Sequence, residues 1–452
     1  MFATKARTSS LYSQRDAVGP TIVTPGNLNQ LKRFLDPATP VRTPLRPQGA
    51  GTASTDCNRC AAGTIVSTAA LDRIVNINSH NFTVTAQAGV RLSRLVRTLA
   101  EHGLELVGGY DLHDRTLGGA IAAPCFGPNI GTSGGYFSSH VTNLKLVTPT
   151  GHLLSINLDR ENLLRAFRMS YGMLGVIYEA TLSVRPIRTF SASHRRVTIE
   201  KFSTVVDTLA NGNIGFKFYL MPYRDRVYLD LRRYETECGN TYQAPWKLKD
   251  WGESTVLPHV FKTLHHLLPI PSVRYRLVDS ISETAYGIVN SRFVTTGSNA
   301  TAQANQTATG RKRGCLYSTW CFPAADFSVV VKAYRDFCEA VLARSRYRCD
   351  LPATGYLLCS DRSSLLSPSY DEPMIALTTA STTQKGWDDF VIDLAEFAEK
   401  WGGIPLISHS RALRAEHVIQ SYNRRLDFFR RMRRKLDPDR RLLNPFLAQF
   451  MQ

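Results

Sequence analysis

The sequence predicts an α+β fold in two parts: a mixed N-terminal part, and a second part built on an antiparallel sheet with flanking helices. Alternating strands at 74–78 and 83–88, followed by apolar residues at helical spacing over 92–99, predict the first part. Alternating strands at 216–220 and 227–231, after a change in composition, predict the second. A chain of 452 residues is long enough for two or three domains.

The elements of the first part follow from local signals. Pro25, Gly26 and Asn27 are typical of the start of a helix, and Gly103 stands where a later helix is expected to end. Short apolar runs predict the strands. In chain order we expect a strand at 21–23, a helix to Leu35, strands at 41–44, 64–67, 74–78 and 83–88, a helix at 92–101, a strand at 143–148 and a short helix at 162–168.

The second part alternates strands with longer helices. We expect strands at 216–220, 227–231, 316–322, 355–359 and 374–378, and helices at 327–344 and 387–400. Residues 296–314 are rich in Ser, Asn, Thr, Gln and Ala without periodicity, which predicts a mobile loop. An active-site lid and a plain disordered insertion both stay open for this loop.

Glycine-rich loops are the main functional signal. In the loop at 46–55, Gly49 and Gly51 flank one alanine, so successive backbone N–H groups can point into one concavity. Hydroxyl groups from Thr52 and Ser54 add donors. The loop therefore predicts a site for a diphosphate.

Three more glycine motifs follow in order, at 116–122, 131–135 and 172–182. The first lacks side chains that would keep a planar ligand away from the backbone, and the last leads into an apolar strand. No G-x-G-x-x-G sequence opens a helix directly after a strand, which argues against a dinucleotide-binding Rossmann unit.

Four glycine motifs in this order resemble the FAD-binding domain of the vanillyl-alcohol-oxidase superfamily, also called the PCMH-type fold. A second signature at 436–447 is similar to the C-terminus of the sugar-alcohol and aldonolactone oxidase branch, which includes the decaprenylphosphoryl-ribose oxidases. The resemblance implies a two-subdomain FAD-binding domain and a substrate cap. The expected division is a flexible lead-in at 1–17, the FAD-binding domain at 18–187, the cap at 188–410, and a C-terminal helix and tail at 411–452 that return to the FAD-binding domain.

The same resemblance implies which residues bind the cofactor. The pyrophosphate would lie on the first loop and the flavin with its ribityl chain against the later motifs. The expected set is Gly49, Ala50, Gly51, Thr52, Ala53, Ser54, Thr116, Gly118, Gly119, Ser133, Tyr136, Val176 and Ile177. Many relatives attach FAD covalently through a His after the first loop, where this chain has Thr52, Ala53 and Ser54, and a Cys link would fall on Leu112. We therefore expect non-covalent FAD.

The catalytic residues are less sharply indicated. Relatives carry a Lys in the segment that here reads 405–411, and this chain has none there. His409 could accept the hydroxyl proton and Arg411 could bind an anionic group, while Tyr356 could wall the pocket. A purely structural role stays open for His409 and for Tyr356.

The resemblance implies oxidation of an alcohol carbon of a polyol, sugar, lactone or hydroxy acid by hydride transfer to flavin N5, with oxygen or another compound as electron acceptor. A flavin-dependent tailoring enzyme of a larger natural product and a non-catalytic, basic FAD protein stay open. The expected partner is a small molecule, and the net charge of +18 mildly favours an anionic one.

Much of this charge lies at 424–435, on a predicted helix with an apolar seam of Leu426, Phe429 and Met432. A solvated helix, a patch for an anionic membrane surface or acidic partner, and an arginine face towards a phosphorylated substrate are the alternatives. No recognised nucleic-acid-binding module accompanies the charge, so we expect no nucleic acid partner.

Composition adds three expectations. No apolar run approaches the length of a membrane span, and no apolar stretch follows Lys5 and Arg7 as in a secretion signal. Of nine cysteines, only Cys57 and Cys60 form a C-x-x-C pair, and without a second pair we expect no metal site. Free thiols fit a reducing cytoplasm, which is the expected location.

Overall fold

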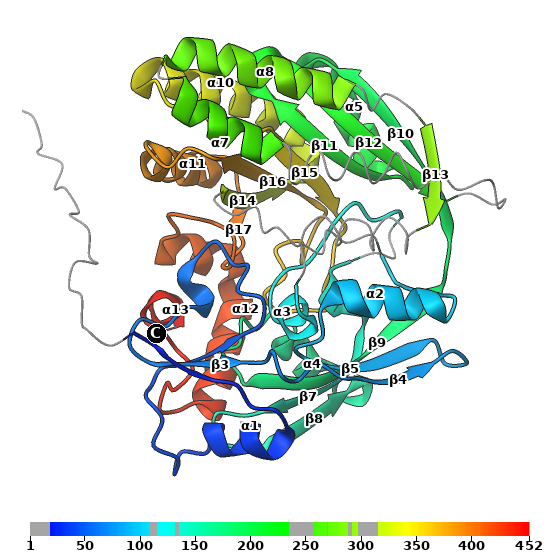
Figure 1. The fold of residues 1–452 in the computed structure, drawn as a ribbon, viewed down its shortest axis with the longest axis vertical. Helices are drawn as coiled ribbons and strands as arrows, with labels where there is room; N and C mark the ends of the chain where they lie inside the picture. Colours follow the sequence, from blue (N-terminus) through cyan, green and yellow to red (C-terminus); the bar gives the residue numbers. More distant parts are fainter. Residues whose placement is uncertain are drawn as a thin grey trace, which may run out of the picture.

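The computed structural model describes residues 19–108, 115–131, 135–234, 257–268, 270–287, 292–296 and 315–451. Three sheets with covering helices make up these parts of the chain (Figure 1). Both the predicted lead-in and nearly all of the predicted loop at 296–314 lie outside the described residues.

A small parallel sheet begins the chain. Its strands are β1 (Thr21–Val23), β3 (Thr64–Ser67) and β2 (Leu45–Gln48), in that order. Asn27 caps helix α1 (Leu28–Leu35) by accepting a hydrogen bond from the Gln30 N–H, as the sequence predicts. The strand expected at 41–44 is wrong: β2 begins at Leu45, the residue that pairs with β3 and is buried against α1.

A second, antiparallel sheet carries the core of the N-terminal half. Helices α2 (Leu92–Glu101), α3 (Leu117–Ala122) and α4 (Glu161–Phe167) contribute buried residues to the same core as this sheet. Its strand order is β4 (Ile74–Asn78), β5 (Thr83–Gln87), β9 (Val176–Pro186), β7 (Val141–Val147) and β8 (Leu153–Asn157), with β6 (Leu104–Leu106) also paired to β9.

The third sheet and its helices form what we call the cap. Helices α5 (Ile199–Asn211), α10 (Phe327–Ser345) and α11 (Trp387–Lys400) share one aromatic-rich core with one face of the sheet. Helices α7 (Leu257–Leu267) and α8 (Pro271–Gly287) pack with alternate residues of β11 and β12, so they lie on the other face of the sheet. The strand order is β13 (Arg292–Thr296), β10 (Thr189–Val197), β12 (Arg226–Tyr234), β11 (Gly215–Met221), β15 (Ala353–Leu358), β16 (Met374–Ser381), β14 (Leu316–Pro323) and β17 (Ile404–Pro405).

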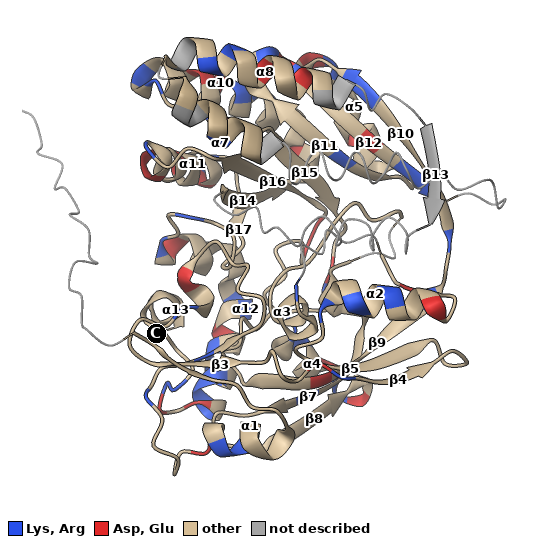
Figure 2. Ribbon diagram, viewed as in Figure 1, with Lys and Arg blue, Asp and Glu red and all other residues tan. Residues whose placement is uncertain are grey.

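The C-terminal segment packs against the N-terminal half. Helix α12 (Ala415–Leu436) buries Leu426 and Phe429 in the core of the N-terminal half, and Met432 packs beside them. The predicted apolar seam is therefore confirmed. Figure 2 shows Lys and Arg positions along this helix. Three of its guanidinium groups donate to main-chain carbonyls, namely those of Arg425, Arg430 and Arg433. Beyond α12, helix α13 (Pro445–Met451) follows Asn444, whose side chain donates to the carbonyls of Asp56 and Arg59.

Candidate active site

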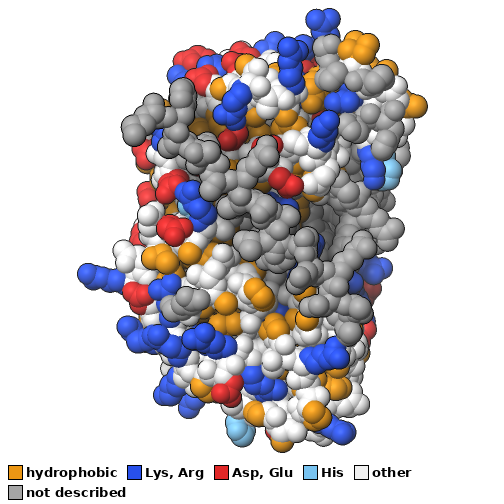
Figure 3. All heavy atoms as spheres, turned by 90° about the vertical axis from the view of Figure 1, so that its left-hand side faces the viewer, with side chains coloured by type: hydrophobic (Ala, Val, Ile, Leu, Met, Phe, Trp, Pro, Cys, Tyr) orange, Lys and Arg blue, Asp and Glu red, His pale blue; other side chains and the backbone are white. Residues whose placement is uncertain are grey.

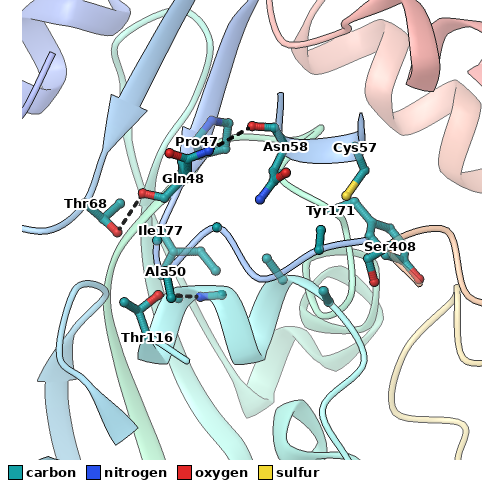
Figure 4. Close-up of a pocket in the computed structure, with 18 of the residues that line it drawn as sticks. Pro47, Gln48, Ala50, Cys57, Asn58, Thr68, Thr116, Tyr171, Ile177 and Ser408 are labelled. Carbon is teal, nitrogen blue, oxygen red and sulfur yellow. Dashed lines mark hydrogen bonds between the residues drawn. The ribbon is translucent and has the colours of Figure 1, made fainter. Parts of the chain in front are cut away.

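A hollow of about 830 Å³, part of it open to solvent, lies where the first glycine loop meets α3, the start of β9 and the turn after β17. Figure 4 shows Thr116 and Ile177 on one side of it and Tyr171 and Ser408 on the other. Most residues that line it come from four segments that are far apart in the sequence, at 46–58, 115–123, 170–177 and 408–409, and Thr68 and Ala88 complete the lining.

Most of the predicted cofactor residues meet in this hollow. Those that line it are Gly49, Ala50, Gly51, Thr52, Ala53, Thr116, Gly118, Gly119, Val176 and Ile177. Ser54 does not line it, because its N–H and hydroxyl group donate to the carbonyls of Ser408 and His409. Tyr136 is buried against the cap, where its hydroxyl group lies 3.0 Å from that of Ser369, and Ser133 lies outside the described residues.

Close backbone packing explains the glycines of the first loop. A Cβ atom on Gly49 would lie 2.0 Å from the Thr116 Oγ1 atom, so only glycine lets this loop rest on the start of α3. Gly51 has φ +66°, a conformation that favours glycine. Thr116 in turn caps α3 by accepting a hydrogen bond from the Gly119 N–H. The first two glycine motifs are therefore in direct contact and together form one side of the hollow.

The first loop presents unused donors. Within the described residues, the N–H groups of Ala50, Thr52 and Ala53 donate to no protein acceptor. Buried or half-buried backbone N–H groups normally have partners. A run of them along one hollow therefore fits a ligand that carries several acceptor oxygens, such as a diphosphate.

Two buried arginines line the same hollow. Arg46 is 1% exposed and donates to the carbonyls of Tyr171, Gly172 and Leu442, so it ties the loop to the C-terminal segment. Burial lowers the pKa of Arg46 to about 10, which leaves it cationic at neutral pH. Arg115 is 9% exposed and its Nε has no partner among the described residues. Both cations strengthen the fit to an anionic ligand.

His409 is held from both sides of its ring. Arg115 donates to its Nε2 atom over 2.9 Å, and its Nδ1 lies 2.6 Å from the Ser408 hydroxyl oxygen. Because a guanidinium only donates, Nε2 is an acceptor, and the ring proton of neutral His409 is on Nδ1 and points to Ser408. The turn that carries His409 is fixed by its own backbone, since the N–H groups of His409 and Ser410 both donate to Leu406.

Residues of the cap and of the C-terminal segment hold the first loop from outside the hollow. The Tyr317 hydroxyl group donates to the Thr52 carbonyl over 2.6 Å, and the Arg411 guanidinium donates to the Ser54 carbonyl over 2.7 Å. Burial raises the pKa of Tyr317, so it stays a neutral donor. Arg411 does not line the hollow, and its observed contact is with the loop backbone.

Tyr356 also lies outside the hollow. It is buried on β15, with its ring 5.8 Å from that of Phe126 and 5.4 Å from the Lys217 ammonium group. In the sheet register Tyr356 pairs with Lys217, so both side chains lie on the same face of the cap sheet. Phe126 belongs to the N-terminal half, so this face looks towards it.

Several lining residues are absent from the predicted cofactor set. Arg46, Arg115, Cys57, Tyr171 and Ser408 reach the hollow through contacts between distant segments. Cys57 is 5% exposed, and burial raises the pKa of its thiol, so it stays protonated at neutral pH. From the sequence, Arg46 and Arg115 could be suspected only because each lies at the start of a glycine motif or directly before one.

Comparisons with known proteins identify the family. A family model described as an FAD binding domain matches residues 20–157. A second, described as D-arabinono-1,4-lactone oxidase, matches residues 180–450, more than half of the chain. The chain belongs to the D-arabinono-1,4-lactone oxidase family. The predicted resemblance is thereby confirmed. The hollow of this family member is lined by residues within the range that matches the FAD binding domain, together with residues 170–177 and the turn at 408–409.

Individual relatives are distant. L-gulono-1,4-lactone dehydrogenase of Mycobacterium tuberculosis is 29% identical over 183 residues, covering 40% of this chain and 42% of its own. The mitochondrial L-galactono-1,4-lactone dehydrogenase 2 of Oryza sativa is 26% identical, covering 53% and 40%. D-arabinono-1,4-lactone oxidase of Yarrowia lipolytica is 25% identical, covering 62% and 52%. The matched region thus spans about half or less of each of these relatives.

Solved structures confirm the predicted fold class of this family member. Cholesterol oxidase from B. sterolicum superposes with a TM-score of 0.76 at 14% identity, covering 95% of this chain and 94% of its own. Berberine bridge enzyme from Eschscholzia californica gives 0.63 at 13% identity, covering 96% and 91%. At these identities the likeness concerns the fold alone.

Among the described residues, none of the helices has the length and hydrophobicity of a transmembrane segment. The same residues contain no cluster of three or more His, Cys, Asp or Glu side chains that could bind a metal ion.

Proposed function

We propose that this protein is an FAD-dependent oxidoreductase that oxidises an alcohol carbon of a sugar lactone or a related polyol. One observation carries the proposal: the unused amides of the first glycine loop and the Arg115–His409 pair line the same hollow. The names of the relatives above, all lactone oxidases or dehydrogenases, support the substrate class.

The hollow fits FAD by its chemistry. The N–H groups of Ala50, Thr52 and Ala53 would hold the diphosphate, and the small residues of α3 would let a flat ring lie against the backbone. FAD, when bound, supplies the hydride acceptor. The protein then has to orient the alcohol, exclude water and receive the hydroxyl proton.

Non-covalent binding of FAD is part of the proposal. Of the described residues that line the hollow, only Cys57 and His409 carry a thiol or an imidazole. The raised pKa of Cys57 keeps it in the unreactive thiol form. Both ring nitrogens of His409 already have hydrogen-bond partners. These two facts support a dissociable cofactor.

His409 is the proposed proton acceptor. Its Nε2 atom is unprotonated and lies in a hydrogen bond with Arg115, so a substrate hydroxyl group would have to replace that donor. The displaced guanidinium would then donate hydrogen bonds to a substrate oxygen. This oxygen could belong to an anionic group or to a lactone carbonyl. Ser408 would hold the ring in place through Nδ1.

The described cysteines are free, which suits a reducing compartment, so a cytoplasmic location stays a prediction. One experiment tests both the substrate and the electron acceptor, which is oxygen or another compound. Purified protein is mixed anaerobically with aldonolactones, polyols and hydroxy acids while flavin absorbance is followed.

Bleaching by a lactone or polyol, and recovery of the absorbance on admitting air or an added acceptor, is the expected result. A yellow protein that no member of the panel reduces would favour a tailoring enzyme acting on a larger substrate. A colourless protein that rejects added FAD would contradict the proposal.

A further inference from the structure

Exposed apolar side chains gather where α7 ends and α8 begins. Large hydrophobic side chains are exposed there by 69% at Leu267, 59% at Ile270, 51% at Val273 and 40% at Leu277. These four, which we call the apolar tip, fall within eleven residues, whereas most other exposed aliphatic residues of the described chain are scattered singly. A group of this kind marks an interaction site more often than isolated residues do.

The inner faces of the two helices are already used. Phe261 of α7 and Val278 of α8 are buried with Tyr219, Met221 and Tyr228 of the cap sheet. The helices are therefore anchored to the cap without the apolar tip. The turn between them is also fixed, since the Arg274 guanidinium donates to the Leu268 carbonyl.

Charges around the apolar tip are one-sided. The two carboxylates of α8 are neutralised from the cap, because Asp279 pairs with Arg348 and Glu283 pairs with Arg224. Helix α7 contains no acidic residue. Lys262 and Arg276 are exposed, and no ion pair involves either of them within the described residues. Among the described side chains of α7 and α8, the surface is therefore apolar at its centre and cationic beside it.

We propose that the apolar tip docks onto a lipid bilayer that contains anionic headgroups. Aliphatic side chains would enter the interface, and Lys262 and Arg276 would remain among the headgroups. A second copy of the chain fits less well, because it carries the same cations and a net charge of +18. Figure 3 shows hydrophobic side chains together with charged side chains of both signs at the top of the face that holds this end of the cap. The proposal is independent of the proposed function.

Sedimentation with vesicles tests the proposal on the full-length protein. We expect binding to vesicles of phosphatidylcholine with phosphatidylglycerol, weaker binding to phosphatidylcholine alone, and a decrease with added salt. The double variant Ile270→Ser/Val273→Ser should bind about tenfold or more weakly, because exposed aliphatic side chains no longer enter the bilayer. Lys262→Gln and Arg276→Gln should each weaken binding about fivefold on anionic vesicles only.

The matched control is Val75→Ser/Leu153→Ser, which removes aliphatic side chains of 52% and 42% exposure from the N-terminal half. It should leave binding unchanged. Insertion is read from Ile270→Trp, whose added emission should shift to the blue and be quenched by brominated lipid. The nine cysteines make thiol labelling a poor alternative.

The absence of vesicle binding at low salt would overturn the proposal. So would full binding by the Ile270→Ser/Val273→Ser variant, or equal binding by the variant and its control. Light scattering could instead show a dimer that the double variant dissociates while vesicle binding stays unchanged. That result would assign the apolar tip to contact with a second copy of the chain.

Discussion

At the scale of single residues, the Arg115–His409 contact decides what the site can do. A histidine whose acceptor nitrogen is already bound by a guanidinium cannot take a proton from that direction until the guanidinium leaves. Arg115 has one further N–H without a partner among the described residues, so it can turn towards a ligand oxygen without breaking all of its contacts. Proton transfer and substrate binding are therefore coupled through this pair.

Replacement of His409 by Ala should slow anaerobic reduction of the flavin by about 10²–10⁴-fold, the usual contribution of a positioned base. The FAD content per chain should stay the same, because the hydrogen bond from Ser54 of the first glycine loop goes to the main-chain carbonyl of His409, which the variant keeps. Stopped-flow absorbance and the flavin-to-protein ratio measure both quantities.

The variant His409→Gln separates two roles of this residue. Its amide oxygen can still accept from Arg115, but it cannot take up a proton. If His409 is the base, flavin reduction should be slow in both variants. A normal rate in His409→Gln with a slow His409→Ala would make His409 a positioning residue for Arg115.

At the scale of elements, the first glycine loop is held by contacts on three sides. It rests on the N-terminus of α3 at Thr116, and Tyr317 of the cap and Arg411 of the C-terminal segment donate to its carbonyls. The N–H groups of Ala50, Thr52 and Ala53 have no acceptor among the described residues, whereas the Thr52 and Ser54 carbonyls accept structural hydrogen bonds. The element is thus fixed in shape before a ligand binds, which lowers the entropic cost of binding.

The variant Gly49→Ala should lose most of its FAD and be destabilised by about 1–3 kcal/mol, because the new Cβ would lie 2.0 Å from the Thr116 Oγ1 atom and one of the two walls must move. The thermal unfolding midpoint and the flavin-to-protein ratio report the two effects. Gly26→Ala is the matched control, since its Cβ would meet nothing closer than 3.6 Å. Retention of FAD by Gly49→Ala at the wild-type level would contradict the role of this loop.

Elements with a strong period or a glycine motif could be predicted from the sequence. Helix α11 matches the predicted range, and α10 extends it by a single residue. Strands β11 and β12 contain the predicted ranges and pair with each other. Burial patterns of period 2 or 3.6 are local, so a single sequence contains them.

Other parts could not be predicted because their cause is distant in the sequence. Arg115 and His409 are 294 residues apart, and nothing near either residue indicates the contact. Tyr136 follows a glycine motif but is drawn into the cap interface by Ser369 and Asp361. Strand β2 falls at Leu45 rather than Val41 because pairing with β3 selects the register.

At the scale of the whole molecule, a loop of the cap enters the N-terminal half. Asp361 accepts hydrogen bonds from the Ser139 hydroxyl group and the Tyr136 N–H, and Arg168 donates to the Ser363 carbonyl. Leu365 and Leu366 of the same loop are buried in the core of the N-terminal half. The cap and the N-terminal half are therefore joined by a core contact as well as by the chain between β9 and β10.

His140 lies beside this junction and gives it a dependence on pH. The pKa of His140 is lowered to about 4, mainly by burial and also by Arg168 and Arg185, while Asp361 acts in the opposite direction. An unfolded chain protonates the same residue near 6.5. Between these values the unfolded state binds more protons, so stability is full above pH 6.5 and falls as the pH decreases towards 4, by on the order of 3 kcal/mol in total.

The variant His140→Asn should therefore flatten the decline in unfolding midpoint between pH 7 and about 5, because a residue that does not titrate cannot favour the unfolded state there. Thermal unfolding across this pH range measures the effect, and the exposed His80→Asn serves as the control, with an unchanged profile. If His140→Asn and the wild-type protein lose stability in parallel, other groups cause the acid sensitivity. A flatter profile for His140→Asn alone would place the acid-sensitive contact at the junction where the cap loop enters the N-terminal half, since Asp361 and Arg168 both act on His140 there.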